Sequence, residues 1–231
     1  PKGSEHLFSE ELWKLGIHSK VWDPMKNSMG NVNGLPALKN GFITFGTLTR
    51  AIRINDRVIQ AWAQILQQVK DSRLMINSSC FTKYSIIDNL KKKFEKHGIT
   101  ANRLDFYYKT PPWDSMREID IALDCFPHNS GTTLMEHLYM GTPYVTYSNR
   151  PSVGRIGASI LTTLGHPEWI ATSEEEYVEK TVALASDTKA LAKIRGSLRK
   201  EMEASSLMDH TGFVLELERA YQAMWMKWCS S

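Results

Sequence analysis

The sequence lacks the features of a membrane-spanning or disulfide-stabilised protein. Its 231 residues contain no run of about eighteen apolar residues, which is near the minimum for a helix that crosses a bilayer. Its few cysteines are Cys80, Cys125 and Cys229, which are odd in number and far apart. Because such a set does not build a disulfide framework, we expect a reducing, cytoplasmic compartment and no membrane partner.

The sequence also lacks a large excess of charge of one sign and any residue spacing typical of a metal site. The chain has 28 Lys and Arg against 25 Asp and Glu, a formal net charge of +3, and the two signs are mixed along most of the sequence. Nucleic acid is therefore not an expected partner. The seven histidines are scattered, and none pairs with Cys or Glu at an interval typical of zinc sites, so we expect no metal.

The glycine-rich turn of dinucleotide-binding enzymes is also missing. Such a turn reads Gly-x-Gly-x-x-Gly and directly follows the first strand. Residues 45–50 at that place read Phe-Gly-Thr-Leu-Thr-Arg, with a single glycine. This excludes a dinucleotide-dependent oxidoreductase.

What the sequence does contain is a regular alternation of strand-like and helical segments from residue 41 onward. Strand-like runs lie at 42–45, 73–76, 103–107, 121–125 and 144–146, and helical patterns lie at 56–69, 83–97, 113–118, 132–140 and 153–164. Asn55 or Asp56 is suited to cap the first of these helices, which buries a stripe from Val58 to Val69. This order predicts an α/β fold with a Rossmann-like parallel sheet and helices on both faces.

The sequence divides into three regions. Residues 1–36 are rich in Gly, Pro, Asn and Ser, and we expect a linker or the edge of an upstream catalytic domain that this chain lacks. Because the first residue is Pro1 rather than Met, we interpret the chain as a piece of a longer one. Residues 37–172 form the Rossmann-like core, and residues 173–231 form C-terminal helices. The last helix, 212–228, has an apolar stripe that we expect to pack partly on something absent.

The segment from Asp120 to Thr146 carries the candidate site. A strand, a polar turn ending at Gly131 and a helix starting at Thr132 and Thr133 follow one another. The first N–H groups of a helix have no partners inside it and carry the positive end of its dipole, so this start can hold a phosphate. Glu136 lies one turn along on the same face, where its carboxylate can accept hydrogen bonds from a sugar's vicinal hydroxyls.

A purely structural alternative exists for the same residues. Thr133 and Glu136 also fit a capping box, in which the two side chains satisfy backbone donors and no ligand is needed. Taken alone, the segment favours this cap. Topology adds one expectation: loops 46–53, 108–112 and 127–133 all follow strands of a parallel sheet, so they should converge where such sheets bind ligands.

A resemblance extends over residues 36 to 228. The blocks that carry it are Pro36-Ala-Leu-Lys-Asn-Gly-Phe-Ile-Thr-Phe-Gly-Thr, Asp120-Ile-Ala-Leu-Asp-Cys-Phe-Pro with Gly131-Thr-Thr, Gly141-Thr-Pro-Tyr-Val-Thr, Arg155-Ile-Gly-Ala-Ser, Ser173-Glu-Glu-Glu-Tyr and Leu215-Glu-Leu-Glu-Arg-Ala-Tyr-Gln-Ala-Met-Trp. In this order they strongly resemble the protein O-linked N-acetylglucosamine transferases and the related SPINDLY-type and bacterial proteins with tetratricopeptide repeats.

The resemblance implies a fold and an activity. It implies the C-terminal half of a GT-B glycosyltransferase, which binds a UDP-sugar and transfers N-acetylglucosamine to Ser or Thr hydroxyls of a protein or peptide acceptor. No cofactor is implied beyond the donor substrate. The general base and the acceptor site would come from the absent N-terminal catalytic domain, which helical repeats precede, so we expect this fragment alone to be inactive.

The resemblance also assigns residues. Arg53 matches a lysine that stabilises the leaving diphosphate and is the candidate catalytic residue, and Arg50 matches a glutamine at the phosphate site. Thr132 and Thr133, after Gly131, match the pair that contacts the diphosphate, and Glu136 matches the acidic residue that binds ribose.

Two departures from the family pattern leave alternatives open. Gly131 and Pro112 stand where the family commonly has histidines, one of which helps to hold the uracil. A GT-B transferase with another nucleotide sugar or acceptor is therefore one alternative, and a non-catalytic Rossmann-like interaction module is another. His128, close to the phosphate turn, receives no catalytic role.

Overall fold

Short parallel strands form one sheet at the centre of the fold. The computed structural model describes residues 5–15, 21–24, 29–150 and 152–230. Its six-stranded sheet has the order β3-β2-β1-β4-β5-β6, with every pair parallel. The strands are β1 (Thr44–Thr47), β2 (Arg73–Asn77), β3 (Leu104–Tyr107), β4 (Ile121–Leu123), β5 (Tyr144–Tyr147) and β6 (Ile170–Ala171). The chain moves outward from β1 to β3 and then returns to the other side of β1, so the order reverses between β1 and β4.

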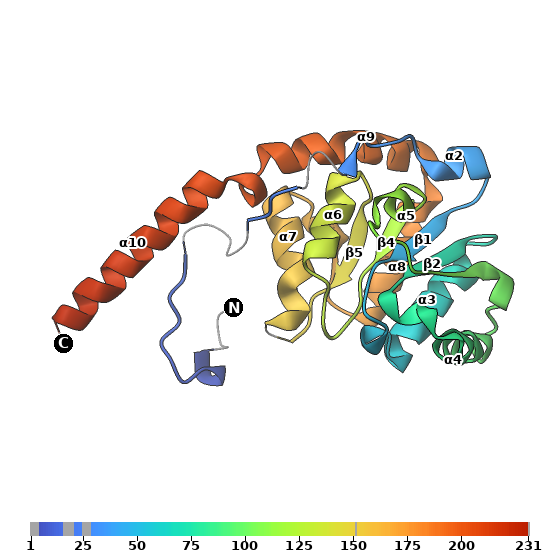
Figure 1. Ribbon diagram of the computed structural model, residues 1–231, viewed down its shortest axis with the longest axis horizontal. Coiled ribbons are helices and arrows are strands. Elements are labelled where there is room, and N and C mark those ends of the chain that lie inside the picture. The colour runs from blue at the N-terminus through green and yellow to red at the C-terminus, as the bar shows by residue number, and fades with distance from the viewer. Residues whose placement is uncertain (1–4, 16–20, 25–28, 151, 231) are drawn as a thin grey trace.

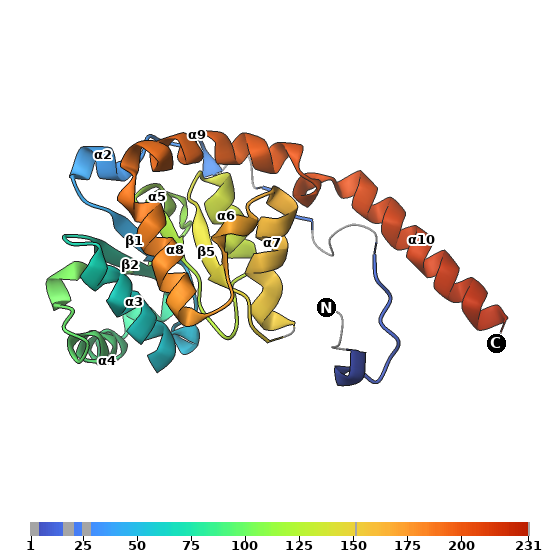
Figure 2. The ribbon, with the colours of Figure 1, turned by 180° about the vertical axis from the view of Figure 1, so that it is seen from behind.

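Helices cover both faces of this sheet, as the alternation predicts. They are α2 (Pro36–Asn40), α3 (Asp56–Gln68), α4 (Tyr84–Glu95), α5 (Trp113–Arg117), α6 (Thr132–Tyr139), α7 (Ile156–Leu164), α8 (Glu174–Ser186), α9 (Thr188–Ala204) and α10 (His210–Cys229). Figure 1 shows α6 and α7 on the near face, and Figure 2 shows α3 and α8 on the opposite face. Helix α9 runs along the edge at which the strands begin (Figure 1).

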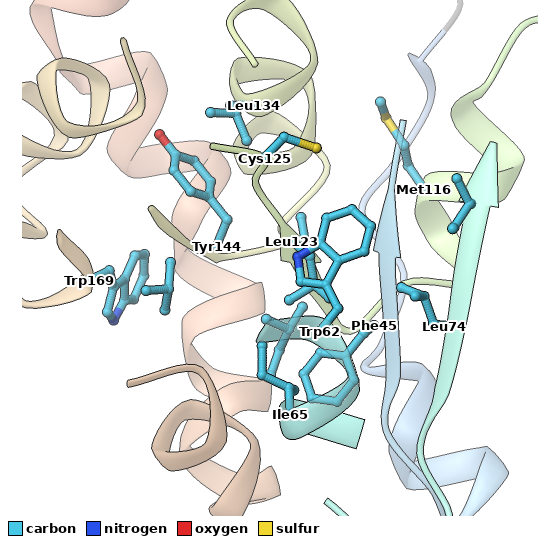
Figure 3. Close-up of a cluster of buried hydrophobic side chains, with 14 of the residues drawn as sticks. Phe45, Trp62, Ile65, Leu74, Met116, Leu123, Cys125, Leu134, Tyr144 and Trp169 are labelled. Carbon is cyan, nitrogen blue, oxygen red and sulfur yellow. The ribbon is translucent and has the colours of Figure 1, made fainter. Parts of the chain in front are cut away.

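The core is centred on α3 and the strands beneath it. Asn55 is the N-cap of α3, and its Oδ1 accepts a hydrogen bond from the N–H of Val58 at 3.1 Å. Trp62 is fully buried and lies with Phe45 and Leu123 between the helix and the sheet (Figure 3). The Trp62 indole N–H donates to the hydroxyl of Tyr177 on α8 at 3.1 Å, so α8 shares this core.

The close packing of β1 requires glycine at position 46. A Cβ added to Gly46 would lie 2.3 Å from the side chain of Ile119. No real Cβ makes such a contact, so Ile119, two residues before β4, and the middle of β1 approach each other only because position 46 has no side chain.

The sequence patterns place most elements close to their observed positions, with three differences. The first strand starts at Thr44 rather than Phe42, because the bend after α2, at its left-handed C-cap Gly41 with φ 77, includes residue 42. Strand β6 has only two residues, too few for a recognisable pattern, and it was not predicted. The predicted helix at 153–164 is a 3-10 turn, Val153–Arg155, followed by α7.

Part of the predicted linker packs on the body of the fold. Trp22 donates its backbone N–H to the carbonyl of Leu207 at 2.9 Å and meets the ring of Tyr139 edge to face at 5.3 Å. Met29 and Leu35 are buried as well. Residues 1–4, 16–20 and 25–28 of the predicted linker lie outside the described residues.

Helix α10 extends away from the rest of the fold in both views (Figures 1 and 2). Within it only Ala220 is buried, while the stripe residues Tyr221, Met224 and Trp228 are 60%, 37% and 76% exposed. Its C-terminal end meets the described N-terminal stretch, where Glu11 pairs with Lys227. That the apolar face packs on something absent from this chain stays a prediction.

His166 follows α7 and connects it to α9. From its contacts we expect the stability of the fold to depend on pH. Its ring nitrogens lie 2.7 Å from Glu168 and 2.8 Å from Glu201, and the ring stacks on Trp169 with centroids 4.0 Å apart. Burial alone would lower the pKa of His166, but the hydrogen bonds to Glu201 and Glu168 outweigh it and raise the pKa above its ordinary value.

A raised histidine pKa stabilises the fold below the unfolded pKa of about 6.5, and this contribution is lost as pH rises through the folded pKa. We expect His166→Gln to lower the melting temperature most near pH 6 and least near pH 8.5, as measured by thermal denaturation across that range. Exposed His210, replaced in the same way, is the control and should show no such trend. A deficit in His166→Gln that is constant with pH would contradict the prediction.

Candidate nucleotide-diphosphate site

A pocket of about 270 Å³ lies at the edge where the strands end, next to the reversal between β1 and β4. Its walls come from the loops after β1, β2 and β3 and from the start of α6: Leu48, Thr49, Arg50, Asn77, Ser78, Ser79, Tyr108, Lys109, Thr110, Pro112 and Thr133. Segments far apart in sequence therefore meet here, and the predicted convergence of the loops is confirmed. This is where parallel α/β sheets bind their ligands.

Helix α6 begins with backbone donors that no protein group satisfies. Its N-cap is Gly131, and no side chain caps it. The N–H of Leu134 bonds to the Gly131 carbonyl at 3.0 Å. Among the described residues, no acceptor bonds the N–H groups of Thr132 and Thr133. These donors and the positive end of the helix dipole can accept an anion.

The capping-box alternative is wrong. A box would need Thr133 at the N-cap position with Glu136 reaching back to it. The helix instead starts at Thr132, so Thr133 is its second residue and makes no cap. Glu136 is half-buried, burial raises its pKa, and its carboxylate has no partner in the described part of the chain. It remains available to hydroxyl donors from a ligand.

The turn before α6 is held by a buried network beneath it. Asp124 follows β4, and its Oδ1 accepts hydrogen bonds from the N–H groups of Ser130 at 2.8 Å and Cys125 at 2.9 Å. Asn129 is also buried, and its side-chain amide donates to the Cys125 carbonyl at 3.1 Å. These three hydrogen bonds set the direction in which the chain enters α6.

Two arginines on the loop after β1 face this region. Arg50 lines the pocket. Arg53 ends a 3-10 turn, is half-buried, and its Nη1 donates to the carbonyl of Asn129 at 3.4 Å. Asn55 ties the same loop to the turn by donating to the Phe126 carbonyl at 2.7 Å. The tertiary structure therefore brings Arg53 to the turn before α6 although 76 residues separate it from Asn129.

Comparisons with known proteins identify the family. A model of glycosyltransferase family 41 matches residues 30–217. The chain belongs to this family. A curated relative from Arabidopsis thaliana, the probable UDP-N-acetylglucosamine–peptide N-acetylglucosaminyltransferase SPINDLY, is 38% identical over 233 residues, which is 99% of this chain and 25% of the relative. The chain thus spans about a quarter of the length of the curated relatives it matches.

Solved structures agree with this membership. A mutant of the Thermobaculum terrenum O-GlcNAc transferase superposes with a TM-score of 0.91 at 30% identity, over 100% of this chain and 44% of that one. An Anabaena protein crystallised with UDP and glucose superposes with a TM-score of 0.56 at 14% identity, over 81% of this chain and 51% of that one. The second likeness, at this low identity, shows only a shared fold. That fold is the C-terminal half of a GT-B glycosyltransferase.

The candidate site contains residues that the sequence patterns did not single out. Asn77, the last residue of β2, accepts the N–H of Lys109 at 2.9 Å and donates to its carbonyl at 3.0 Å, which holds the loop beside the pocket. Asp124 directly follows β4. Polar residues at the carboxyl ends of strands are the available signal for such positions, because ligands of parallel sheets bind there.

The ring of His128, in the turn before α6, is neutral at pH 7. Burial, and to a smaller extent the charges of Arg53 and Arg150, lower its pKa.

The described ranges contain no candidate metal site: no three His, Cys, Asp or Glu side chains are grouped so as to hold a metal ion. In the same ranges, no helix is both long and apolar enough to cross a membrane.

Proposed function

We propose that this chain is the donor-binding half of a glycosyltransferase that moves N-acetylglucosamine from UDP-GlcNAc to Ser or Thr hydroxyls of proteins. The start of α6 carries the proposal: its unpaired N–H groups lie at the switch point of the sheet, next to the turn that Arg53 contacts. Arg50 and Thr133 line the pocket there, and the carboxylate of Glu136 lies one turn further along α6. The names of the family 41 relatives support the donor and the acceptor class.

Each residue has a chemical task in this proposal. Thr132 and Thr133 donate their N–H groups to the diphosphate, and Arg50 adds positive charge at the pocket wall. Glycosyl transfer breaks the bond between the sugar C1 and the diphosphate oxygen, which leaves negative charge on the departing group. Arg53 stabilises that charge, and donors already oriented toward it lower the barrier. The proposal includes no metal, because these groups supply the positive charge.

Other parts of the transferase lie outside this chain in the proposal. The general base and the acceptor-binding surface belong to an upstream catalytic domain, which helical repeats precede. The chain alone then binds donor and transfers nothing. The proposal also places the protein in the cytoplasm, in keeping with its unpaired cysteines.

Calorimetric titration with nucleotides tests the proposal. UDP and UDP-GlcNAc should release heat and raise the melting temperature at millimolar concentration or below, with or without EDTA. A parallel series with UDP-glucose, GDP and ADP decides the alternative of another nucleotide sugar, since Pro112 and Gly131 replace the family's histidines. Folded protein that shows neither heat nor a thermal shift with any nucleotide would favour the non-catalytic interaction module.

Glu136 should discriminate a nucleotide from a bare diphosphate. We expect Glu136→Ala to weaken UDP binding about tenfold or more, because a hydrogen bond to a charged group contributes about 1.5–3 kcal/mol. Inorganic pyrophosphate has no ribose, so its affinity should not fall in the variant. Equal losses for both ligands, measured by the same titration, would contradict a ribose contact.

A further inference from the structure

The buried carboxylate of Asp124 is placed where it can influence a bound diphosphate. It is fully buried at the carboxyl end of β4. Besides the N–H groups of Cys125 and Ser130, it accepts the hydroxyl of Thr146 at 2.8 Å through Oδ2. An added Cβ at Gly157 of α7 would come within 2.4 Å of the Thr146 hydroxyl and 3.1 Å of Asp124 Oδ2, so no water or side chain separates α7 from this network.

Through Ser130, this carboxylate determines where α6 begins. Ser130 precedes the N-cap Gly131, and its N–H points inward to Asp124 rather than outward. The N–H groups that follow, those of residues 131–133, have no acceptor in the described part of the chain. Asp124 therefore fixes the N–H of Ser130 on the protein side of the turn and leaves the following donors available to a ligand.

The charges around Asp124 are few. Arg53, from the loop after β1, is the charged group that lowers the pKa of Asp124, and it also holds the Asn129 carbonyl. The other titratable groups facing it are Cys125, Tyr144 of β5 and Tyr177 of α8, and burial raises the pKa of each. They are neutral near pH 7. His128, beside Arg53, is neutral as well.

We propose that Asp124 is a positioning residue of the diphosphate site, which aligns the α6 donors and, when ionised, repels the bound diphosphate. This inference rests on the proposed function. Asp124 Oδ1 holds the N–H of Ser130 directly before the N-cap of α6, so its negative charge lies next to the site of the diphosphate. Two negative groups this close repel each other, so donor binding favours the neutral form of Asp124. Donor affinity then depends on whether Asp124 carries a charge.

The direction of the pH dependence follows from this repulsion. Burial raises the pKa of Asp124 to about 7. A bound diphosphate raises it further, so binding takes up a proton and affinity falls as pH rises above 7. A rise of one unit corresponds to about tenfold in affinity. UDP-GlcNAc is a suitable probe because its two phosphates are ionised throughout the range from pH 6 to pH 8.

Asp120 provides a matched control at the other end of β4. It is also fully buried, and its two oxygens accept N–H groups of Ala37 and Thr44, both at 2.8 Å. Burial raises its pKa too. Its neighbouring cation is Arg195, on the edge of the sheet opposite the pocket. Asp120→Asn thus removes a buried charge without touching the diphosphate site.

The test is titration with UDP-GlcNAc at pH 6, 7 and 8. The wild-type chain and Asp120→Asn should lose about three- to tenfold in affinity from pH 6 to pH 8. Asp124→Asn keeps an acceptor for Ser130 and carries no charge, so its affinity should be independent of pH and no weaker than that of the wild type at pH 8. Asp124→Ala loses the acceptor and should bind more weakly at every pH.

The outcomes separate the two proposals. Binding with a flat wild-type profile, or a slope retained in Asp124→Asn, overturns the role of Asp124 and leaves the donor site standing. Absence of UDP-GlcNAc binding at every pH overturns both. Because the asparagine variant keeps the Oδ1 acceptor for Ser130 and Cys125, the test does not depend on the alanine variant folding.

Discussion

Replacement of Arg53 by alanine is expected to weaken the binding of UDP and UDP-GlcNAc by about ten- to a hundredfold. The guanidinium donates to the carbonyl of Asn129 in the turn before α6, and Arg53 is half-buried. A charge-assisted hydrogen bond contributes about 1.5–3 kcal/mol, and about 1.4 kcal/mol corresponds to a factor of ten in affinity. Isothermal titration of the two ligands measures the loss directly.

Two further variants show whether the effect belongs to Arg53. Arg53→Lys keeps a point charge but not the two-pronged grip on phosphate oxygens, so its affinity should lie between wild type and alanine. Arg57 is an exposed arginine on α3 that pairs with Glu174. Arg57→Ala should leave binding within about twofold, as expected for a surface change. Similar losses in both alanine variants would point to a general electrostatic effect instead of a phosphate contact.

Replacement of Arg195 by alanine should lower the free energy of unfolding by about 3–5 kcal/mol, the usual cost of removing one partner from a buried charged network. Arg195 is 1% exposed on α9. Its guanidinium donates to the carbonyls of Ile119 at 2.8 Å and Asn33 at 2.9 Å, and to the side chain of Asn33 at 2.7 Å. Without it the buried carbonyl of Ile119 loses this donor, and the buried carboxylate of Asp120 loses the cation beside it.

Urea denaturation followed by tryptophan fluorescence measures this loss. Burial lowers the pKa of Arg195 to about 10, which leaves it charged at neutral pH, so the loss should not change between pH 6 and pH 8. Lys193 is exposed on the same helix, and its alanine variant should differ from wild type by less than about 0.5 kcal/mol. A comparable effect of the two substitutions would show that the buried network contributes little.

Local chemistry made much of the fold predictable. Asn55 or Asp56 ahead of an apolar stripe predicted the start of α3, and the structure shows that Asn55 is the cap. Strand-helix alternation predicted the parallel sheet. The start of α6 at Thr132 was predicted correctly, but the choice between a cap and an anion site was not decided by the residues alone. Only the position of Gly131 as N-cap excludes the capping box.

Errors and omissions arose where distant residues decide the outcome. Strand β6 exists because two residues pair with β5, not because they have a pattern of their own. Asp124 looks like the polar end of an apolar run, and its role depends on Ser130 and Thr146. Arg195 looks like one of many helix-surface arginines, and its main partner, Asn33, lies 162 residues earlier in the chain.

By itself, the sequence determined the order of strands and helices, the helix start at Thr132 and the family resemblance, because these depend on neighbouring residues and on their spacing. The tertiary structure decided that Arg53, Asp124 and the start of α6 lie close together. The reversal of strand order between β1 and β4 brings their loops together. Burial then sets the charge states of the groups there, and burial depends on segments that no local pattern specifies.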